Sequence, residues 1–289
     1  MAIGREPRPD TNGLARLRPR DRRAALAFLR QTRAHNAYLL AQIGRGALSR
    51  DDLAGPLMGH WSDGALDGVA IFGSNLVLSS PCSPAARDGF ATYARLKGFR
   101  VWVAVGEDAL IAAFMEAYGR SRRDIVLERK GQRLYALRER PEDPGKVTGL
   151  RPADIREAEA LMRLDRAMVH EELGFDPFQR DVEGYRRGWH GRIREERSWI
   201  VERGREIICK VDHSASSEDV VQLAGIYTVP GSRRQGVARR AIARMCHELL
   251  RRVPVVTLYV NADNTPAIRL YEALGFEHIG FVRSVWFAD

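Results

Sequence analysis

The sequence predicts an α/β fold of the α+β kind, with two tandem lobes that each hold a mixed, mostly antiparallel twisted sheet flanked by helices. Three observations lead to this prediction. Short strands with glycine at their turns occur in each half, amphipathic helices separate the other strands, and the same order of elements begins again after the proline- and glycine-rich residues 141–146. The predicted domains are therefore residues 1–140 and 147–289, with residues 141–146 as the linker.

The bulk composition supports a globular protein of this size. A chain of 289 residues with 45% hydrophobic content can bury the cores of two domains. No apolar stretch is long enough for a membrane span or a secretory signal, so we expect a cytoplasmic protein without membrane contact. The widely separated Cys82, Cys209 and Cys246 argue against disulfides and a zinc site, and we expect three buried free thiols and no metal.

Apolar periodicity and turn residues predict the elements of the first half in order. They are a strand at 14–18, helices at 21–32 and 36–43, strands at 57–64, 65–73 and 74–80, a helix at 84–96, a strand at 100–105, a helix at 107–118, and a strand pair at 124–130 and 132–139. The first helix has an apolar face that includes Ala25, Leu26 and Leu29. The three consecutive strands, with glycine at their turns, indicate an antiparallel meander.

The second half repeats this order. Its predicted elements are a strand at 147–150, helices at 153–170 and 179–196, a hairpin of 198–204 and 205–211, a strand at 220–229, a helix at 236–251, a strand at 255–260, a helix at 264–274, and closing strands within 277–288. The helix at 264–274 has Asn264 at its N-cap, Pro266 in its first turn and Gly275 as its stop.

The loop between the strand at 220–229 and the next helix is the stretch with the clearest chemistry. A helix that starts near Gly236 presents unpaired N–H groups and the positive end of its dipole, and glycine lets a phosphate approach the backbone closely. Arg233 and Arg234 add positive charge. Taken alone, the pattern predicts either an anion site or merely a basic turn before a helix.

The loop resembles the pyrophosphate loop of the GNAT superfamily of N-acetyltransferases, which is Arg or Gln, two residues, Gly, one residue, and Gly or Ala. The matching residues here are Arg233, Arg234, Gln235, Gly236, Val237 and Ala238. The resemblance implies acetyl-coenzyme A as the cofactor, with its pyrophosphate on the amides of this loop. It also implies that the Ile226 amide faces the thioester carbonyl, and that Thr228 and Val229 form hydrogen bonds with the pantetheine.

A second segment, residues 259–276, carries the same resemblance. In the family the equivalent helix supplies an asparagine to the pantetheine and a tyrosine near the sulfur, and Asn264 and Tyr271 match them. The implied reaction is direct transfer of an acetyl group to a primary amine of a small molecule or a protein. The Ile226 amide would stabilise the oxyanion, and Tyr271 would protonate the departing thiolate.

The general base and the acceptor site stay open at this point. In one branch of the family a strand glutamate is the base, and Gln222 occupies that position here. A water chain, or an acid from the turn after the first helix of this half, could remove the proton; the candidates there are His170, Glu171 and Glu172, which also fit a solvated turn. Tyr227 and Trp286 fit either an acceptor pocket or a core role.

The first half has proline and serine where the second has its arginine and glycine loop, so we expect a degenerate lobe that binds no cofactor. This arrangement is similar to two-lobed bacterial acetyltransferases and, more distantly, to mycothiol synthase. Two alternatives remain. Gln222 permits an acyl-coenzyme A sensor without catalysis, although Tyr271 argues against it. The net charge of +9 permits a nucleic-acid module, although the scattered arginines argue against it. The sequence fits a monomer or a homodimer.

Overall fold

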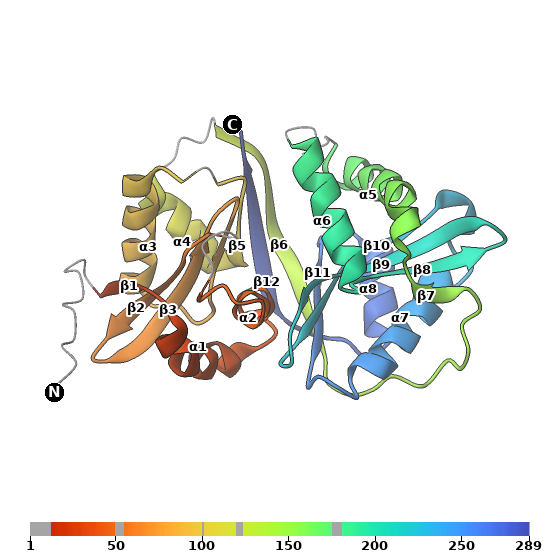
Figure 1. The fold of residues 1–289 in the computed structure, drawn as a ribbon, viewed down its shortest axis with the longest axis horizontal. Coiled ribbons are helices and arrows are strands. Elements are labelled where there is room, and N and C mark those ends of the chain that lie inside the picture. The colour runs from red at the N-terminus through yellow and green to blue at the C-terminus, as the bar shows by residue number, and fades with distance from the viewer. Residues whose placement is uncertain (1–12, 50–54, 100, 120–123, 175–180, 289) are drawn as a thin grey trace. The chain divides into compact units, whose positions relative to one another are not determined.

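The computed structural model describes residues 13–49, 55–99, 101–119, 124–174 and 181–288 (Figure 1). It divides into two compact units. Unit 1 comprises Met1–Leu134, Val260–Asp263 and Ile279–Asp289, and unit 2 comprises Tyr135–Tyr259 and Asn264–His278. These bounds differ from the predicted domains 1–140 and 147–289, because most of the last strand of the chain clusters with unit 1.

Besides short 3₁₀ turns, the described residues of the first half form a series of helices and strands. They are β1 (Leu14–Arg16), α1 (Arg22–Leu29), α2 (Ala37–Gly44), β2 (Leu57–Ser62), β3 (Ala65–Phe72), β4 (Asn75–Leu78), α3 (Pro84–Lys97), β5 (Val103–Glu107), α4 (Asp108–Tyr118) and β6 (Ile125–Leu137). The sheet order in unit 1 is β1-β2-β3-β4-β5-β12-β6. Strands β1 to β4 pair antiparallel, β4 and β5 pair parallel, and β12 pairs antiparallel with β5.

The second half forms its elements in the same sequence. They are β7 (Leu150–Pro152), α5 (Ala158–Leu173), α6 (Val182–Arg194), β8 (Ser198–Arg203), β9 (Glu206–Ser216), β10 (Val221–Thr228), α7 (Val237–Leu249), β11 (Val256–Val260), α8 (Thr265–Glu272) and β12 (Glu277–Phe287). In unit 2 the sheet order is β11-β10-β9-β8-β7, with the end of β6 beside β11. Strands β7 to β10 pair antiparallel, and β10 and β11 pair parallel.

Both halves therefore follow the order strand, two helices, three strands, helix, strand, helix, strand. The predicted fold class, a mixed and mostly antiparallel sheet flanked by helices, is confirmed. The predicted strand pair at 124–130 and 132–139 is wrong, because β6 runs through both segments as one strand. Gly131 has a left-handed φ of 60°, but its N–H donates to Asp108 Oδ1 instead of closing a hairpin turn. The predicted helix at 179–196 begins outside the described residues and is seen as α6.

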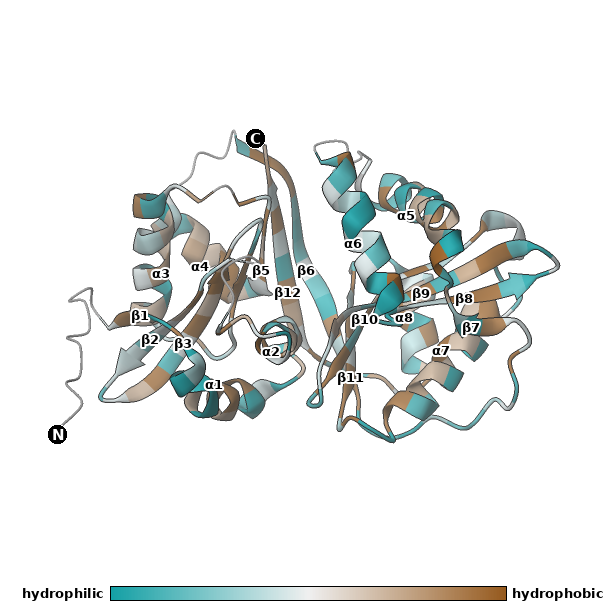
Figure 2. Ribbon diagram, in the orientation of Figure 1, coloured by the Kyte–Doolittle hydropathy of each residue, from teal (hydrophilic) through white to brown (hydrophobic). Residues whose placement is uncertain are grey.

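Each unit has its own apolar core, and Figure 2 shows apolar and hydrophilic bands alternating along both the strands and the helices. In unit 1, Val285 and Phe287 of β12 lie in one buried cluster with Phe72, Phe90 and Phe114. In unit 2, helices α5 and α6 pack on β8 through a cluster that contains Leu161, Trp189 and Ile200. Aromatic and aliphatic side chains of this size dominate the free energy of core formation.

The cysteines follow the prediction with one exception. All three are free thiols, and Cys209 and Cys246 are buried. Cys82 is half-buried instead of buried, because it lies in the connection between β4 and α3. Among the helices that the structure describes, none is long and apolar enough to cross a bilayer.

Candidate functional site

The first part of the site is an opening between the two parallel strands of unit 2. Strands β10 and β11 pair only at Val221 with Val256 and at Gln222 with Thr257, although both strands, described throughout, continue beyond these residues. The rest of β10 pairs with β9 on its other side. The backbone of β10 after Gln222 therefore has one edge that β11 does not cover, and an extended ligand can form hydrogen bonds along such an edge.

The direction of the β10 amides follows from the ladder with β9. The Val229 N–H donates to Ile208 O at 3.0 Å, and successive N–H groups of a strand point to opposite edges. The Thr228 N–H therefore points to the open edge, whereas Ile226 lies between Ala224 and Tyr227, where the register shifts and this alternation is interrupted. The Val229 N–H, which was expected to contact the pantetheine, is already bonded to Ile208, so it can serve a ligand only if that bond breaks.

The second part of the site is the start of α7. Its N-cap is Gly236, with a left-handed φ of 71°, and no described side chain caps the helix there. The first hydrogen bond of the helix runs from the Arg240 N–H to Gly236 O, so the amides of Val237, Ala238 and Arg239 point out of the helix end. Arg234 also has a left-handed φ, 61°, and loops of this kind gather N–H groups into anion-binding concavities.

The matching helix of unit 1 has a closed start. The Ser83 hydroxyl accepts a hydrogen bond from the Ala86 N–H at 3.0 Å and donates to Asp67 Oδ2 at 2.7 Å, and Pro84 occupies the first helical position. A capped helix that starts with proline offers fewer free amides to an anion. The open start of α7 fits a pyrophosphate, whereas the start of α3 does not.

Arg233 and Gln235 of the loop have partners inside the protein. Arg233 donates through Nη2 to Glu171 Oε2 at 2.8 Å and through Nε to Thr228 O at 2.9 Å. Its guanidinium also lies 5.4 Å from the ring centroid of Tyr227, whose hydroxyl donates to Glu171 Oε1 at 2.7 Å. Gln235 accepts from Arg203 Nη1 and donates to Gly231 O. An anion at the loop therefore competes with Glu171 for Arg233.

The third part of the site is α8, which follows β11. The Asn264 side chain caps this helix by accepting from the Ala267 N–H at 3.2 Å, and no described residue accepts a hydrogen bond from its amide NH₂ group. Tyr271 is buried between the rings of Tyr135 and Phe276, with centroids 6.4 Å and 5.8 Å away. The described residues offer the Tyr271 hydroxyl no hydrogen-bond partner. Burial raises the pKa of Tyr271 well above its usual range, and the negative charge of Glu172 raises it further.

The residues that the sequence offered as a general base or as an acceptor pocket have different surroundings in the structure. Glu171 is held by Tyr227 and Arg233, and the hydrogen bond from the Tyr227 hydroxyl is the main cause that lowers the pKa of Glu171. Glu172 acts electrostatically on Tyr271, as noted above, and also raises the pKa of Tyr259 after the larger effect of burial. Tyr227 packs on Met168 and Val169 of α5. Trp286 lies on β12 opposite Val103, within unit 1.

A buried charge network beside β10 was not expected from the sequence. Lys210 of β9 has no exposed surface, and its Nζ donates to Asp165 Oδ1 at 2.9 Å, Asp212 Oδ2 at 2.6 Å and Gly225 O at 3.0 Å. Nζ also lies 5.3 Å from the ring centroid of Trp189. Burial lowers the pKa of Lys210, but Asp212 and Asp165 together outweigh it and the pKa is raised, in keeping with an ammonium group that donates to two carboxylates. The sequence signal for this network is a lysine in the apolar run 207–211.

Each carboxylate of the network has a further donor. The Tyr185 hydroxyl donates to Asp165 Oδ2 at 2.9 Å, and the Ser198 hydroxyl donates to Asp212 Oδ1 at 2.5 Å. Arg192 Nη1 lies 3.6 Å from Asp212 Oδ2, so two positive charges face two negative ones. Removing one partner from such a buried group leaves an uncompensated charge, which is costly.

His213 lies next to this network, and its lowered pKa makes the stability of the protein depend on pH. Burial lowers the pKa of His213 from 6.5 to about 4, although Asp212 raises it. The unfolded chain therefore binds this proton more readily, and stability is lost as the pH falls from 6.5 toward about 4. We expect a loss of about 3 kcal/mol over this window, measured by urea unfolding. His213→Gln should flatten this slope, whereas the exposed His170→Gln should retain it; equal slopes in all three proteins would contradict the assignment.

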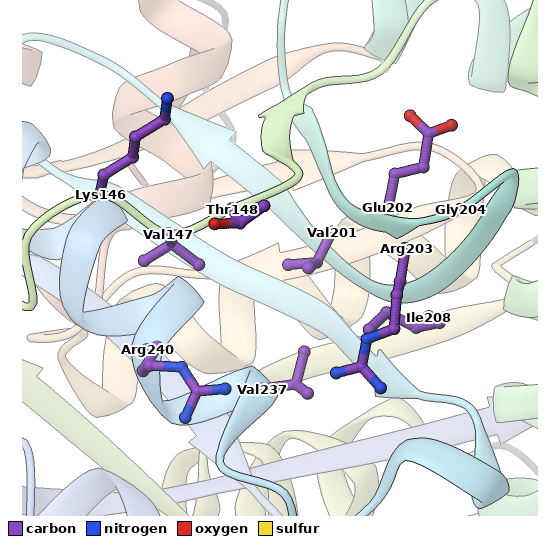
Figure 3. Close-up of a pocket in the computed structure, with 10 residues that line it drawn as sticks. All are labelled: Lys146, Val147, Thr148, Val201, Glu202, Arg203, Gly204, Ile208, Val237 and Arg240. Atoms are coloured by element: carbon purple, nitrogen blue, oxygen red, sulfur yellow. The ribbon is translucent and has the colours of Figure 1, made fainter.

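A cavity of about 350 Å³ lies beside the start of α7 and is lined by residues of unit 2 alone (Figure 3). Val237 and Arg240 of α7, Arg203 of the β8–β9 hairpin and Lys146 contribute to its wall. In Figure 3, Val237 lies between the Arg240 and Arg203 side chains. Ile226, Asn264 and Tyr271 do not line it, so this cavity is distinct from the opening between β10 and β11.

Comparison with known protein families gives one matching model. Residues 161–276 match the model of the acetyltransferase (GNAT) family, and this range contains the open edge of β10, the start of α7 and Tyr271. Among curated proteins, mycothiol acetyltransferase of Acidothermus cellulolyticus is 70% identical over 30 residues, which are 10% of this chain. The match spans only 9% of the length of that relative.

Solved structures resemble the fold over most of the chain. A Drosophila protein of 14% identity has a TM-score of 0.64, and the alignment covers 96% of this chain and 99% of that one. A GCN5-related N-acetyltransferase from Kribbella flavida has 18% identity, a TM-score of 0.51, and coverage of 87% and 96%. A tandem GNAT protein from the clavulanic acid biosynthesis pathway has 14% identity, a TM-score of 0.50, and coverage of 95% and 97%.

Proposed function

The chain carries a domain of the acetyltransferase (GNAT) family in residues 161–276, and from this premise we propose that it is an N-acetyltransferase that moves an acetyl group from acetyl-coenzyme A to a primary amine. The single observation that carries the proposal is the uncapped start of α7 at Gly236, beside the open edge of β10. Together they suit a ligand with a pyrophosphate at one end and an amide-containing arm. The alternative is an acyl-coenzyme A sensor without turnover.

Acetyl-coenzyme A would supply an activated acyl group. In this proposal the amides of Gly236, Val237 and Ala238 bind its pyrophosphate, while the Thr228 amide and the Asn264 side chain orient the arm. The Ile226 N–H then donates to the thioester oxygen, where negative charge develops. Tyr271 holds the proton that the leaving sulfur needs, because its raised pKa keeps the phenol protonated at neutral pH.

For the general base we favour Glu172 over Glu171 and His170. Glu171 is engaged by Arg233 and Tyr227, and the hydrogen bonds that lower its pKa also make it a weaker base. The charge of Glu172 raises the pKa of Tyr271, after the larger effect of burial, so Glu172 is the candidate acid that is electrostatically coupled to the proposed proton donor. Gln222 cannot take a proton, so in this proposal Glu172 takes the role of the family's strand glutamate.

The test is a turnover assay of the full chain with acetyl-coenzyme A and a panel of small amines and peptides, with free thiol as the readout. Thiol release that requires an acceptor supports the proposal. Tight acetyl-coenzyme A binding, measured by calorimetry, with no thiol release for any acceptor favours the sensor. Absence of binding contradicts both. Salt-sensitive DNA binding that acyl-coenzyme A does not displace would instead support the nucleic-acid module.

Glu171→Gln is expected to strengthen coenzyme A binding. The Glu171–Arg233 pair is nearly half-exposed on both sides and is worth less than about 1 kcal/mol, so its loss frees Arg233 for the pyrophosphate and raises affinity up to about fivefold. Calorimetric titration with coenzyme A measures the change. The matched control, Glu172→Gln, removes a neighbouring charge but leaves Arg233 paired, and equal effects of both substitutions would rule out a specific competition.

A further inference from the structure

The peptide group between Gly225 and Ile226 is placed by a bulge in β10. From Ala224 to Tyr227 the strand advances three residues, while its partner β9 covers only two, from Asp212 to Lys210. One residue of β10 is therefore extra, and the local ladder is interrupted. Gly225 has a left-handed φ of 56°, and a Cβ at this position would lie 2.3 Å from Asp212 Oδ2 and 2.8 Å from Lys210 Nζ. Only glycine fits this position.

In place of the ladder, the Gly225 carbonyl accepts a hydrogen bond from Lys210 Nζ at 3.0 Å. A trans peptide group is planar, and its C=O and N–H point in opposite directions. The contact that holds the Gly225 oxygen therefore also fixes the direction of the Ile226 N–H, which points away from the lysine. The same N–H is the proposed donor to the thioester oxygen.

The charge on the lysine acts on the same peptide group. A hydrogen bond from an ammonium group is stronger than one from a neutral donor, and hydrogen bonds in series polarise one another. Electron density drawn toward the Gly225 oxygen makes the Ile226 N–H a better donor. All three Nζ protons have acceptors, in Asp165, Asp212 and Gly225, so the ammonium cannot rotate away without losing a charged partner.

We infer that Lys210 is a positioning residue for catalysis: through Gly225 O it aims and polarises the Ile226 N–H that stabilises the oxyanion. Asp165 and Asp212 keep the lysine charged and in place. The inference rests on the proposed function, since it assigns a role in that reaction to a network that touches no substrate. A purely structural network predicts a change in stability alone, whereas a positioning role also predicts a change at the thioester carbonyl.

The experiment measures the carbonyl stretch of bound ¹³C-labelled acetyl-coenzyme A by isotope-edited infrared spectroscopy, which needs no acceptor. The wild-type protein should lower this frequency relative to the free cofactor. Lys210→Met with Asp212→Asn removes one charge of each sign and should lose about half of the displacement or more. Its comparator, Asp212→Asn alone, keeps the lysine, its partner Asp165 and, in the new amide oxygen, an acceptor beside Nζ, so the Gly225 contact should persist and its displacement should stay close to that of wild type.

Further readouts separate the inference from a loss of fold and from a failure of the proposed function. Affinity for coenzyme A, which has no carbonyl at this position, should not change, while kcat with any accepted amine should fall about tenfold in the double variant. Lys210→Gln keeps an N–H donor without charge and should give an intermediate displacement. The exposed Lys97→Met should match wild type.

Each outcome has one reading. An unchanged displacement in the folded double variant overturns the inference. If the lysine variants do not fold, Asp212→Asn decides, since a displacement that is lost while Lys210 and Asp165 are both present contradicts the role of the lysine. A wild-type protein that does not bind acetyl-coenzyme A overturns the proposed function. A wild-type protein that binds it without any displacement overturns the oxyanion contact, and the inference with it.

Discussion

Tyr271→Phe is expected to lower kcat by about 10² to 10⁴-fold while coenzyme A affinity stays nearly unchanged. The substitution removes only the hydroxyl, and the ring keeps its packing between Tyr135 and Phe276. Because the leaving thiolate then lacks its proton donor, the loss falls on turnover and not on cofactor binding. Steady-state kinetics of thiol release, combined with calorimetric titration of coenzyme A, separate the two quantities.

A neighbouring tyrosine offers the control for Tyr271. The Tyr135 hydroxyl donates to Glu272 Oε1 at 2.8 Å, so Tyr135→Phe removes a hydroxyl from the adjacent ring without touching the proposed acid. It should change kcat little. Burial places the pKa of Tyr271 far above neutrality, so wild-type kcat should show no loss from this group up to about pH 9. An unchanged rate for Tyr271→Phe at every pH would remove this tyrosine as the acid.

Gly236→Glu is expected to weaken coenzyme A binding about 100-fold or more compared with Gly236→Gln. Both side chains have the same shape, and both suffer the left-handed φ of 71°, which costs a non-glycine residue about 1 to 2 kcal/mol. A carboxylate near a phosphate adds repulsion of about 3 to 4 kcal/mol at short range in a partly exposed site. About 1.4 kcal/mol corresponds to a tenfold change in affinity.

The Gly236 pair of variants is measured by titration with coenzyme A at two salt concentrations. The difference between Glu and Gln should shrink as the ionic strength rises, because exposed charges are screened. Their thermal stabilities should be similar to each other and below that of wild type. Equal affinities of the two variants would show that the pyrophosphate does not lie at the start of α7.

Local sequence signals predicted the parts of the site that depend on backbone conformation. Glycine at 236 and asparagine at 264 specify a helix start through φ and capping, and both positions are found at the N-caps of α7 and α8. The repeated order of elements was also readable, because it depends on turn residues and periodicity in each segment. These features can be predicted from local sequence, without knowing which distant residues are in contact.

Features that depend on distant pairs were missed. Asp165 and Lys210 lie 45 residues apart, and nothing in either segment indicates that α5 places a carboxylate over β9. Arg233 and Glu171 are 62 residues apart, so the sequence of the loop did not indicate that Arg233 already has a carboxylate partner. The strand pair expected at 124–139 failed for a related reason: Gly131, between the two expected strands, has a left-handed φ inside one strand, where its N–H donates to Asp108, 23 residues earlier in the chain.

The place of β12 in unit 1 affects how the protein can be made. This strand lies between β5 and β6 in the sheet order, and Val285 and Phe287 belong to the core with Phe72 and Phe114. During synthesis, residues 1–134 leave the ribosome long before residues 279–287. Until β12 is made, β5 lacks one of its two neighbouring strands, and the core lacks the side chains of Val285 and Phe287. Open strand edges on a nascent chain pair readily with other chains. Unit 1 therefore completes its sheet only after residues 279–287 have been synthesised, although most of the unit is made much earlier.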